Sequence, residues 1–338
     1  MLKRLALTAA AFSAPGIALT VASERLIRPR IFYSGPWHPD PPDAVGWPHE
    51  EARIYTADGL ELQGWFFTQP QPSESKTEIP SESKTEIPSE SKTEIPRTRG
   101  TTTRGTTTRG TTARGTTTCG RTPTILFMHG TSYNASDMWI TEERARAFHE
   151  FMSRIRCNFL VFDYRGFGPN PGRTTEEGTY TDAAAALAWL YARADVDPAT
   201  IFYYGFSLGT GIATGLALRE PPRGLILRAP FTSVRGIATG RYPKIRAALA
   251  LAPWLPLTNY DTLRKIRRYE GPLLVMHGDA DTTVPEYMGQ QIFEAAPGPK
   301  RYVAFPNSGH SDVSPDLVVP PITQFVDDVL TGLIHTPA

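Results

Sequence analysis

Ser207 lies in a short segment whose residue types suit nucleophilic chemistry. The sequence Gly-Phe-Ser-Leu-Gly covers residues 205–209 and directly follows the apolar run Ile-Phe-Tyr-Tyr. Glycines two residues before and after the serine allow a sharp turn from a strand into a helix, which raises the serine hydroxyl at the end of the strand. A tight turn that only needs small residues has the same pattern. The role of Ser207 therefore depends on whether the chain also supplies a base and a carboxylate.

A base and a carboxylate for Ser207 are found in two later segments. A serine hydroxyl becomes a strong nucleophile only when a base removes its proton, and an oriented imidazole is the usual base. His310, in the segment PNSGHSD after the last apolar run, is the predicted base. Asp281, in HGDADTTVP, is the predicted carboxylate that orients the imidazole, and Asp279 beside it is assigned a capping or supporting role.

Two other histidines end apolar runs and compete with His310. His129 and His277 each stand in a Met-His-Gly segment. His129 is expected to shape the turn behind the site, and His277 precedes Asp281 by too few residues to be its natural partner. A metal enzyme that uses His129, His277 and Asp279 is an alternative, but a sheet would hold both histidine turns in structural roles. We expect no metal and no cofactor.

The oxyanion formed during acyl transfer needs two backbone N–H donors. One comes from the residue after the nucleophile and one from the loop after an earlier strand. These positions are Leu208 and Thr131, the latter directly following the segment FMHG. Backbone donors carry no side-chain signature, so this assignment rests on position alone.

The elements that must position these residues alternate between two types. From Thr124 onward, apolar runs such as TILFMHG, NFLVFDYRG, TIFYYGFS, GLILRAPF and PLLVMHGDAD alternate with helical stretches such as TEERARAFHEFMSR and DAAAALAWLYARA. Continuous apolar strands that alternate with helices predict a parallel sheet covered on both faces. Active residues in such sheets lie at the carboxyl ends of the strands. Upstream, residues 51–67 predict a β-hairpin that turns at Ala57-Asp58-Gly59.

The set of motifs resembles the signature of the α/β-hydrolase superfamily. FMHGTSYN, DYRGFG, GFSLG, HGDADTTVP and SGH carry the resemblance, which covers residues 54–67 and then Thr124 to the C-terminus. The chain is similar to the membrane-anchored, lidless branch that includes animal α/β-hydrolase domain proteins and bacterial homologues. The serine–aspartate–histidine order is also that of this superfamily. In two places the sequence departs from the family: TSYN stands where Asn-Ala-Gly-Asn is common, and Arg228 where a glutamate is common.

The resemblance implies an α/β fold with a mostly parallel sheet of about eight strands, helices on both faces and no large cap domain. It implies that Ser207, Asp281 and His310 form a catalytic triad, with Thr131 and Leu208 supplying the oxyanion amides. Only about 40 residues separate LILRAPF from PLLVMHG, fewer than an ordinary separate domain contains. Apolar side chains in this stretch either line a groove or cover the sheet: Leu249, Leu251, Trp254, Leu255 and Leu257.

The first 30 residues predict a hydrophobic anchor or signal segment. A short basic stretch, MLKR, precedes the mostly apolar LALTAAAFSAPGIALTVAS. This stretch lies between the length of a secretory signal core and the roughly 20 residues of a membrane span. We favour an uncleaved single-pass anchor. The alternatives are a cleaved signal, which would give a secreted or periplasmic protein, and a buried helix.

Tandem repeats interrupt the predicted catalytic domain, which covers residues 44–338. SESKTEIP occurs three times from Ser73 to Pro96, and four near-copies of TTTRG run from Thr101 to Gly120. Neither block has enough apolar residues to offset its own ordering entropy, which predicts a disordered insert over residues 71–121. A tolerated loop expansion is favoured over a binding tail or stalk, because the entropy of loop closure grows only slowly with loop length.

Composition argues against nucleic-acid binding, and the motifs favour one function. The net charge of +1 gives no basic field for nucleic acid. We predict a serine hydrolase that cleaves acyl esters or thioesters, with a small-molecule or lipid-like acyl substrate and membrane association through the N-terminal segment. A serine peptidase of the same fold is the nearest alternative. A catalytically silent, membrane-tethered binding protein is the other.

Overall fold

The computed structural model describes residues 42–70, 121–241 and 260–334. The predicted N-terminal segment (1–30), the repeat insert (71–121, apart from Arg121) and the five apolar residues between 249 and 257 lie outside these ranges. Within the described ranges, none of the helices combines the length and the apolar character needed to cross a bilayer.

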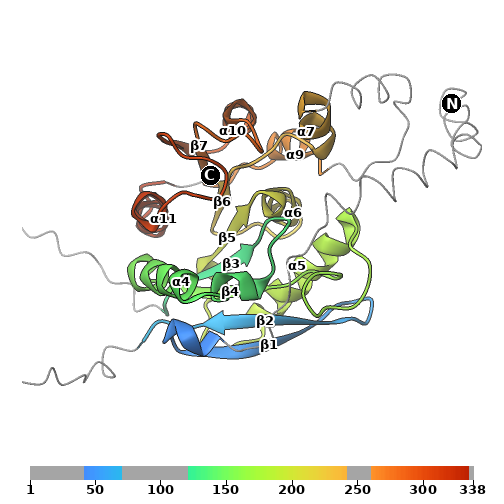
Figure 1. The fold of residues 1–338 in the computed structure, drawn as a ribbon, viewed down its shortest axis with the longest axis vertical. Coiled ribbons are helices and arrows are strands. Elements are labelled where there is room, and N and C mark those ends of the chain that lie inside the picture. The colour runs from blue at the N-terminus through green and yellow to red at the C-terminus, as the bar shows by residue number, and fades with distance from the viewer. Residues whose placement is uncertain (1–41, 71–120, 242–259, 335–338) are drawn as a thin grey trace, which may run out of the picture. The chain divides into compact units, whose positions relative to one another are not determined.

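The described part of the chain forms an eight-stranded sheet with the strand order β1-β2-β4-β3-β5-β6-β7-β8 (Figure 1). The β1–β2 and β2–β4 pairs are antiparallel, and every later pair is parallel. The strands are β1 His49–Tyr55, β2 Glu61–Phe67, β3 Thr124–Met128, β4 Asn158–Phe162, β5 Ile201–Phe206, β6 Gly224–Arg228, β7 Leu273–Gly278 and β8 Lys300–Phe305. The mostly parallel sheet predicted from the alternating pattern is confirmed.

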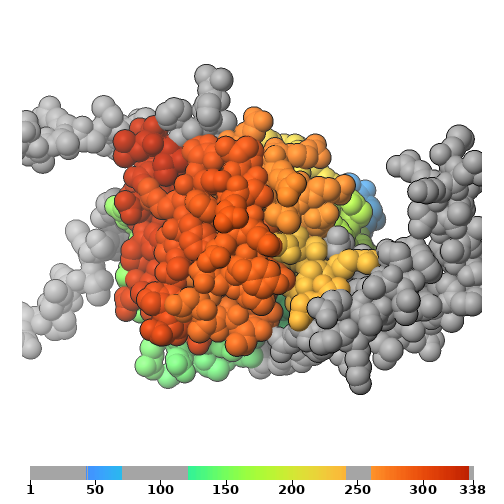
Figure 2. Space-filling view, turned by 90° about the horizontal axis from the view of Figure 1, so that it is seen from above, coloured from blue at the N-terminus to red at the C-terminus, as the bar shows by residue number. Residues whose placement is uncertain are grey.

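Helices cover both faces of the sheet. The α-helices are α4 Glu142–Ile155, α5 Glu176–Tyr191, α6 Leu208–Ala217, α7 Val234–Arg241, α9 Thr262–Ile266, α10 Glu286–Ala295 and α11 Pro315–Leu330. Helices α4 and α11 lie on one face, with α5 and α6 on the other (Figure 1). Figure 2 shows an end of the molecule formed largely by α9 to α11 and their strands, in orange and red.

Strand β5 shows why the central strands are apolar at every position rather than alternately apolar and polar. All six of its residues are buried. Phe202, Tyr204 and Phe206 belong to the core cluster under α4 and α11, whereas Ile201 and Tyr203 belong to the cluster under α5 and α6. Successive side chains of a strand point to opposite faces, so a strand covered on both sides must be apolar at every position.

Asn158, at the start of β4, holds together the two chain ends that flank the repeat segment. Its side-chain Oδ1 accepts a hydrogen bond from the backbone N–H of Gln69, 3.0 Å away. Its own backbone N–H donates to the Pro123 carbonyl at 2.8 Å. Since Phe67 pairs with Phe159 and Thr124 with Asn158, both ends lie at the sheet edge where the parallel strands begin.

The connection between β6 and β7 runs over residues 229–272 and contains α7 and α9. It is shorter than the roughly 50 residues of the smallest ordinary domains. The connection between β6 and β7 is therefore too short to hold a separate domain of ordinary size, in keeping with the prediction of no large cap domain. The carboxyl ends of β3 and of β5 to β8 meet at the edge opposite Asn158, which is the edge where the candidate residues lie.

Candidate active site

Ser207 is the single residue between β5 and α6, and its backbone has a conformation that residues other than glycine rarely adopt. Its φ is 52° and its ψ is −116°. Such strained conformations cost about 1–3 kcal/mol and occur mainly at functional sites. The backbone N–H of Ser207 donates to the Arg228 carbonyl at 3.0 Å. A methyl group at Gly209 would overlap the Met128 carbonyl of β3, so the glycine after the serine lets α6 begin directly against the neighbouring strand.

The structure brings the three predicted triad residues together. His310, in the loop after β8, has its Nε2 3.0 Å from the Ser207 Oγ. Its Nδ1 is 2.6 Å from the Asp281 Oδ2, in the loop after β7. The carboxylate can only accept, so Nδ1–H donates to Asp281 and Nε2 is left to accept the serine proton. The His310 side chain is 15% exposed and the Asp281 side chain is fully buried.

Asp281 is fixed by hydrogen bonds at both carboxylate oxygens. Its Oδ1 accepts from the backbone N–H groups of Thr283 and Val284, each at 2.8 Å. Burial alone raises the pKa of Asp281, but hydrogen bonds from His277, His310 and the backbone outweigh it and hold the pKa below its ordinary value. The carboxylate is therefore charged at neutral pH, as an orienting group for an imidazolium must be.

His277, which the sequence argument set aside, touches the same carboxylate. The turn after β7 folds back, with the Asp281 N–H donating to the Gly278 carbonyl at 3.2 Å. This brings the Asp281 Oδ2 to 3.5 Å from the His277 Nε2. Nε2–H donates to the Val284 carbonyl at 2.8 Å. The spacing of four residues in HGDAD is the signal that could have revealed this support. Asp279, assigned a capping or supporting role, is exposed.

The two residues predicted to supply the oxyanion amides belong to two segments that lie next to Ser207. Leu208 is the first residue of α6, and amides in the first turn of a helix have no intrahelical acceptor. Thr131 follows Gly130, where an added methyl group would stand 3.1 Å from the Ser207 Cβ. The loop after β3 therefore runs directly beside the serine.

A buried histidine–aspartate pair holds that loop in place. The Asp163 Oδ1 accepts from the Ala135 N–H at 2.8 Å and lies 3.4 Å from the His129 Nε2. The Tyr164 hydroxyl donates to the His129 carbonyl at 2.9 Å. His129 thus shapes the turn behind the site, as the sequence argument expected.

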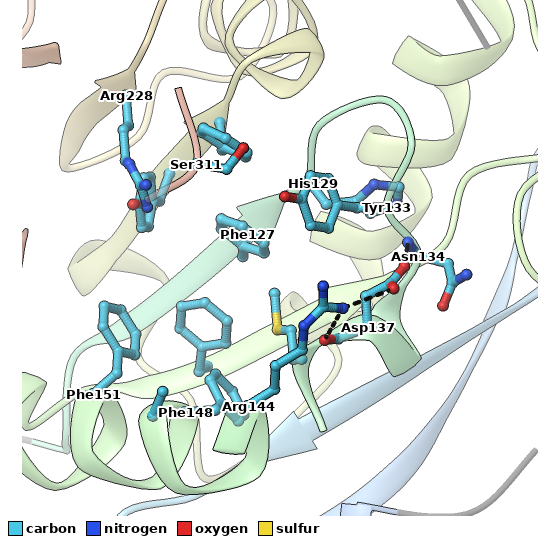
Figure 3. Close-up of a pocket in the computed structure, with 15 residues that line it drawn as sticks. Phe127, His129, Tyr133, Asn134, Asp137, Arg144, Phe148, Phe151, Arg228 and Ser311 are labelled. Carbon is cyan, nitrogen blue, oxygen red and sulfur yellow. Dashed lines mark hydrogen bonds and ion pairs between the residues drawn. The ribbon is translucent and has the colours of Figure 1, made fainter. Parts of the chain in front are cut away.

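An aromatic cavity of about 340 Å³ opens next to these residues. Its lining includes Phe206 and Ser311, the chain neighbours of Ser207 and His310. It also includes Tyr133, from the segment TSYN, and Arg228, which are the two places where the sequence differs from the common family pattern (Figure 3). The remaining lining comes from β3, β4, β5, α4 and the loop between β3 and α4: Phe127, His129, Asn134, Asp137, Met138, Arg144, Ala147, Phe148, Phe151, Phe159 and Tyr204. This volume lies within the range of small-molecule binding sites.

The residues proposed for a metal enzyme do not form one cluster. His129 is engaged with Asp163, His277 with Val284 and Asp281, and Asp279 is exposed. No group of three potential metal-ligating side chains occurs in the described ranges. The geometry thus gives the metal alternative no support.

The chain resembles known proteins over part of its length. Residues 123–236 match the family model described as the alpha/beta hydrolase fold. An uncharacterized protein of Mycobacterium tuberculosis is 40% identical over 198 residues, which cover 57% of this chain and 64% of that protein. Human protein ABHD12B is 33% identical, covering 52% of this chain and 50% of that protein. The lysophosphatidylserine lipase ABHD12 of Danio rerio is 28% identical, covering 52% and 47%. The chain therefore matches less than two thirds of each of these relatives.

Solved structures resemble the whole fold at lower sequence identity. An esterase of Pyrococcus furiosus has a TM-score of 0.58 at 18% identity, covering 88% of this chain and 98% of that one. A puromycin-hydrolyzing peptidase of Mycobacterium tuberculosis has a TM-score of 0.55 at 16% identity, covering 87% and 41%. The described part of the chain has the α/β-hydrolase fold, and its sequence resembles that superfamily.

Proposed function

We propose that this protein is a serine hydrolase that cleaves acyl esters or thioesters through an acyl-enzyme intermediate. The observation that carries the proposal is the continuous chain from Ser207 Oγ through the His310 imidazole to the Asp281 carboxylate, with contacts of 3.0 and 2.6 Å. A nucleophile, a base and an orienting acid within hydrogen-bond reach of one another are the arrangement that acyl transfer requires.

The reaction follows from these contacts. Ser207 Oγ attacks the acyl carbonyl carbon while its proton passes to His310 Nε2, and Asp281 stabilises the imidazolium that forms. The amides of Leu208 and Thr131 donate to the oxyanion of the tetrahedral intermediate. As the carbonyl re-forms, the bond to the alcohol or thiol breaks and His310 returns the proton to the leaving group. Water, activated by the same imidazole, then hydrolyses the acyl-enzyme.

The cavity favours esters and thioesters over peptides. Its walls are mostly apolar and rich in aromatic rings, and they suit an acyl chain better than a charged peptide amine. A peptidase that binds a free amine needs an available carboxylate. Asp137, the acid in the lining, already accepts from Arg144 at 3.1 Å and from the Asn134 N–H at 2.8 Å. A small or lipid-like acyl substrate fits these walls, and the assembled triad disfavours a catalytically silent binding protein.

We also propose that residues 1–30 tether the domain to a membrane as a single-pass anchor, with signal cleavage and release as the alternative. The proposal is supported by the apolar stretch after the basic MLKR. Carbonate extraction of membranes from expressing cells tests it: a tethered chain stays with the membrane, whereas a cleaved chain is released and lacks its first residues in N-terminal sequencing.

Labelling with a fluorophosphonate probe tests the nucleophile. The wild-type protein should be labelled at Ser207, and Ser207→Ala should abolish labelling and lower kcat on p-nitrophenyl acyl esters by about 10⁴-fold or more. Ser153→Ala, which changes an exposed serine on α4, is the matched control and should retain labelling and turnover. Labelling of another serine in the Ser207→Ala variant contradicts the proposal, as does faster turnover of an aminoacyl amide than of every acyl ester.

A further inference from the structure

Arg228, at the end of β6, brings a cation without a carboxylate partner to the aromatic cavity. Its side chain is partly buried, and its Nε is enclosed without a hydrogen-bond partner. Among the described residues, no carboxylate forms an ion pair with it. The other arginine in the lining, Arg144, contrasts with it, because Arg144 pairs with Asp137 at 3.1 Å. One guanidinium in the cavity is therefore neutralised within the protein and the other is not.

The unpaired cation lies close to the proposed triad. The Arg228 guanidinium sits over the Phe206 ring, 4.7 Å from its centroid. The ring centroid of His310 is 5.2 Å from the centroid of the same phenylalanine. The Arg228 carbonyl accepts the Ser207 N–H. Figure 3 shows Arg228 and Ser311 at one end of the cavity, away from the Arg144–Asp137 pair.

An enclosed guanidinium donor without an acceptor is energetically costly. The Phe206 ring attracts the charge but accepts none of the N–H groups in the plane of the guanidinium. Anionic oxygens supply what is missing, because a guanidinium donates two parallel hydrogen bonds to a carboxylate or a phosphate. The surrounding walls are aromatic, so such an anion would be attached to an apolar chain or group.

We propose that Arg228 makes this cavity select acyl substrates that carry an anionic group, a carboxylate or a phosphate monoester, near the scissile ester. The inference rests on the proposed serine hydrolase function and specifies the substrate class of the same site. An anion on the acyl chain and an anion on the alcohol share the same recognition chemistry, and the experiment distinguishes them.

Two matched substrate pairs test the proposal. Mono-p-nitrophenyl adipate and p-nitrophenyl hexanoate differ by an anion on the acyl side, and monoacylglycerol phosphate and monoacylglycerol of one chain length differ by an anion on the alcohol side. The wild-type protein should prefer the anionic member of at least one pair in kcat/KM. Arg228→Gln should lower that anionic-to-neutral ratio about tenfold or more, and Arg228→Lys should restore part of it. Arg146→Gln, which removes an exposed charge on α4, should leave the ratio unchanged.

The outcomes separate this proposal from the one on which it rests. If neutral esters are hydrolysed but Arg228→Gln leaves both ratios unchanged, the anion site is wrong and the serine hydrolase stands. If no ester is hydrolysed, binding to Ser207→Ala decides: mono-p-nitrophenyl adipate should raise the thermal midpoint more than p-nitrophenyl hexanoate, and adding Arg228→Gln should remove the difference. Equal shifts from the two compounds overturn the anion site in that case as well.

Discussion

Two of the histidine–aspartate pairs at the edge of the sheet that carries the candidate site, His129–Asp163 and His310–Asp281, differ in what they face. Only the His310–Asp281 pair faces Ser207, the proposed nucleophile. In the pair after β3 and β4, His129 is 2% exposed, with its Nδ1 2.8 Å from the Gly130 carbonyl oxygen and its Nε2 3.4 Å from Asp163. In the pair after β7 and β8, His310 donates to Asp281 through Nδ1 and presents Nε2 to Ser207. An imidazole beside a carboxylate is therefore not sufficient for catalysis. The group that faces the second ring nitrogen of each imidazole distinguishes the roles of the two histidines.

We infer that the two histidine–aspartate pairs also have different roles at the candidate site. Asp163 accepts from the Ala135 N–H and so fixes the loop that carries the Thr131 amide. The His129 ring packs against Tyr164, with ring centroids 4.3 Å apart. We therefore assign the buried pair to holding the oxyanion loop and the partly exposed pair to proton transfer. This division can be tested by changing one pair at a time.

The largest expected contrast is between the two histidines. His310→Ala removes the base and should lower kcat by about 10⁴-fold or more, with little change in the thermal midpoint. His129→Ala leaves a void among buried aromatic rings and should cost about 2–4 kcal/mol of unfolding free energy, with a much smaller fall in kcat. Steady-state kinetics and denaturant unfolding on both variants measure this. Equal losses of kcat would refute the division.

A smaller contrast is expected between the two aspartates of the HGDAD segment. Asp281→Asn should lower kcat about 10²- to 10⁴-fold, because an amide orients the imidazole in the wrong tautomer. Asp279 is exposed, so Asp279→Asn should change kcat less than about threefold, in keeping with surface substitutions. Ester kinetics under saturating substrate provide the comparison. The opposite ranking would assign the orienting acid to Asp279.

The smallest effect is a pH dependence of stability centred on Asp281. Its pKa in the folded protein lies below the ordinary value of 3.8, so its charged form contributes stability above that pH. The contribution is lost as pH falls through the lower folded pKa. Asp281→Asn should therefore lower the thermal midpoint by a few degrees at neutral pH, and the difference should shrink toward strongly acidic pH. Calorimetry at several pH values tests this, and a difference that stays constant down to acid contradicts it.

The parts of the molecule that depend on local pattern could be predicted from the sequence. The parallel sheet follows from continuous apolar runs, and the meeting of Ser207, Asp281 and His310 follows from the rule that parallel strands end at one edge. The helical stretch DAAAALAWLYARA leaves out the start of α5, although Thr175 caps it locally. Glu176, the first residue of the helix, is also bound to Lys265 and to the Tyr260 N–H. These are contacts across more than 80 residues of chain.

The cavity and its charge could not be predicted from the sequence pattern, because both depend on contacts between residues that lie far apart in the chain. Phe127, Phe151 and Tyr204 meet only because β3, α4 and β5 pack together. Nothing near Arg228 in the sequence shows that its guanidinium lacks a partner, since that depends on which carboxylates other elements bring close. The contact of His277 with Asp281 likewise depends on how sharply the intervening turn folds back.

Asn158 has a consequence for how this chain can change in length over generations. Because it binds both Gln69 and Pro123, the two ends of the repeat segment are fixed across one short gap at the edge opposite Ser207. Each doubling of the connecting length adds only about 0.6 kcal/mol of closure cost. Copies of an eight-residue unit can therefore be gained or lost as the gene is replicated, at little cost to the stability of the fold.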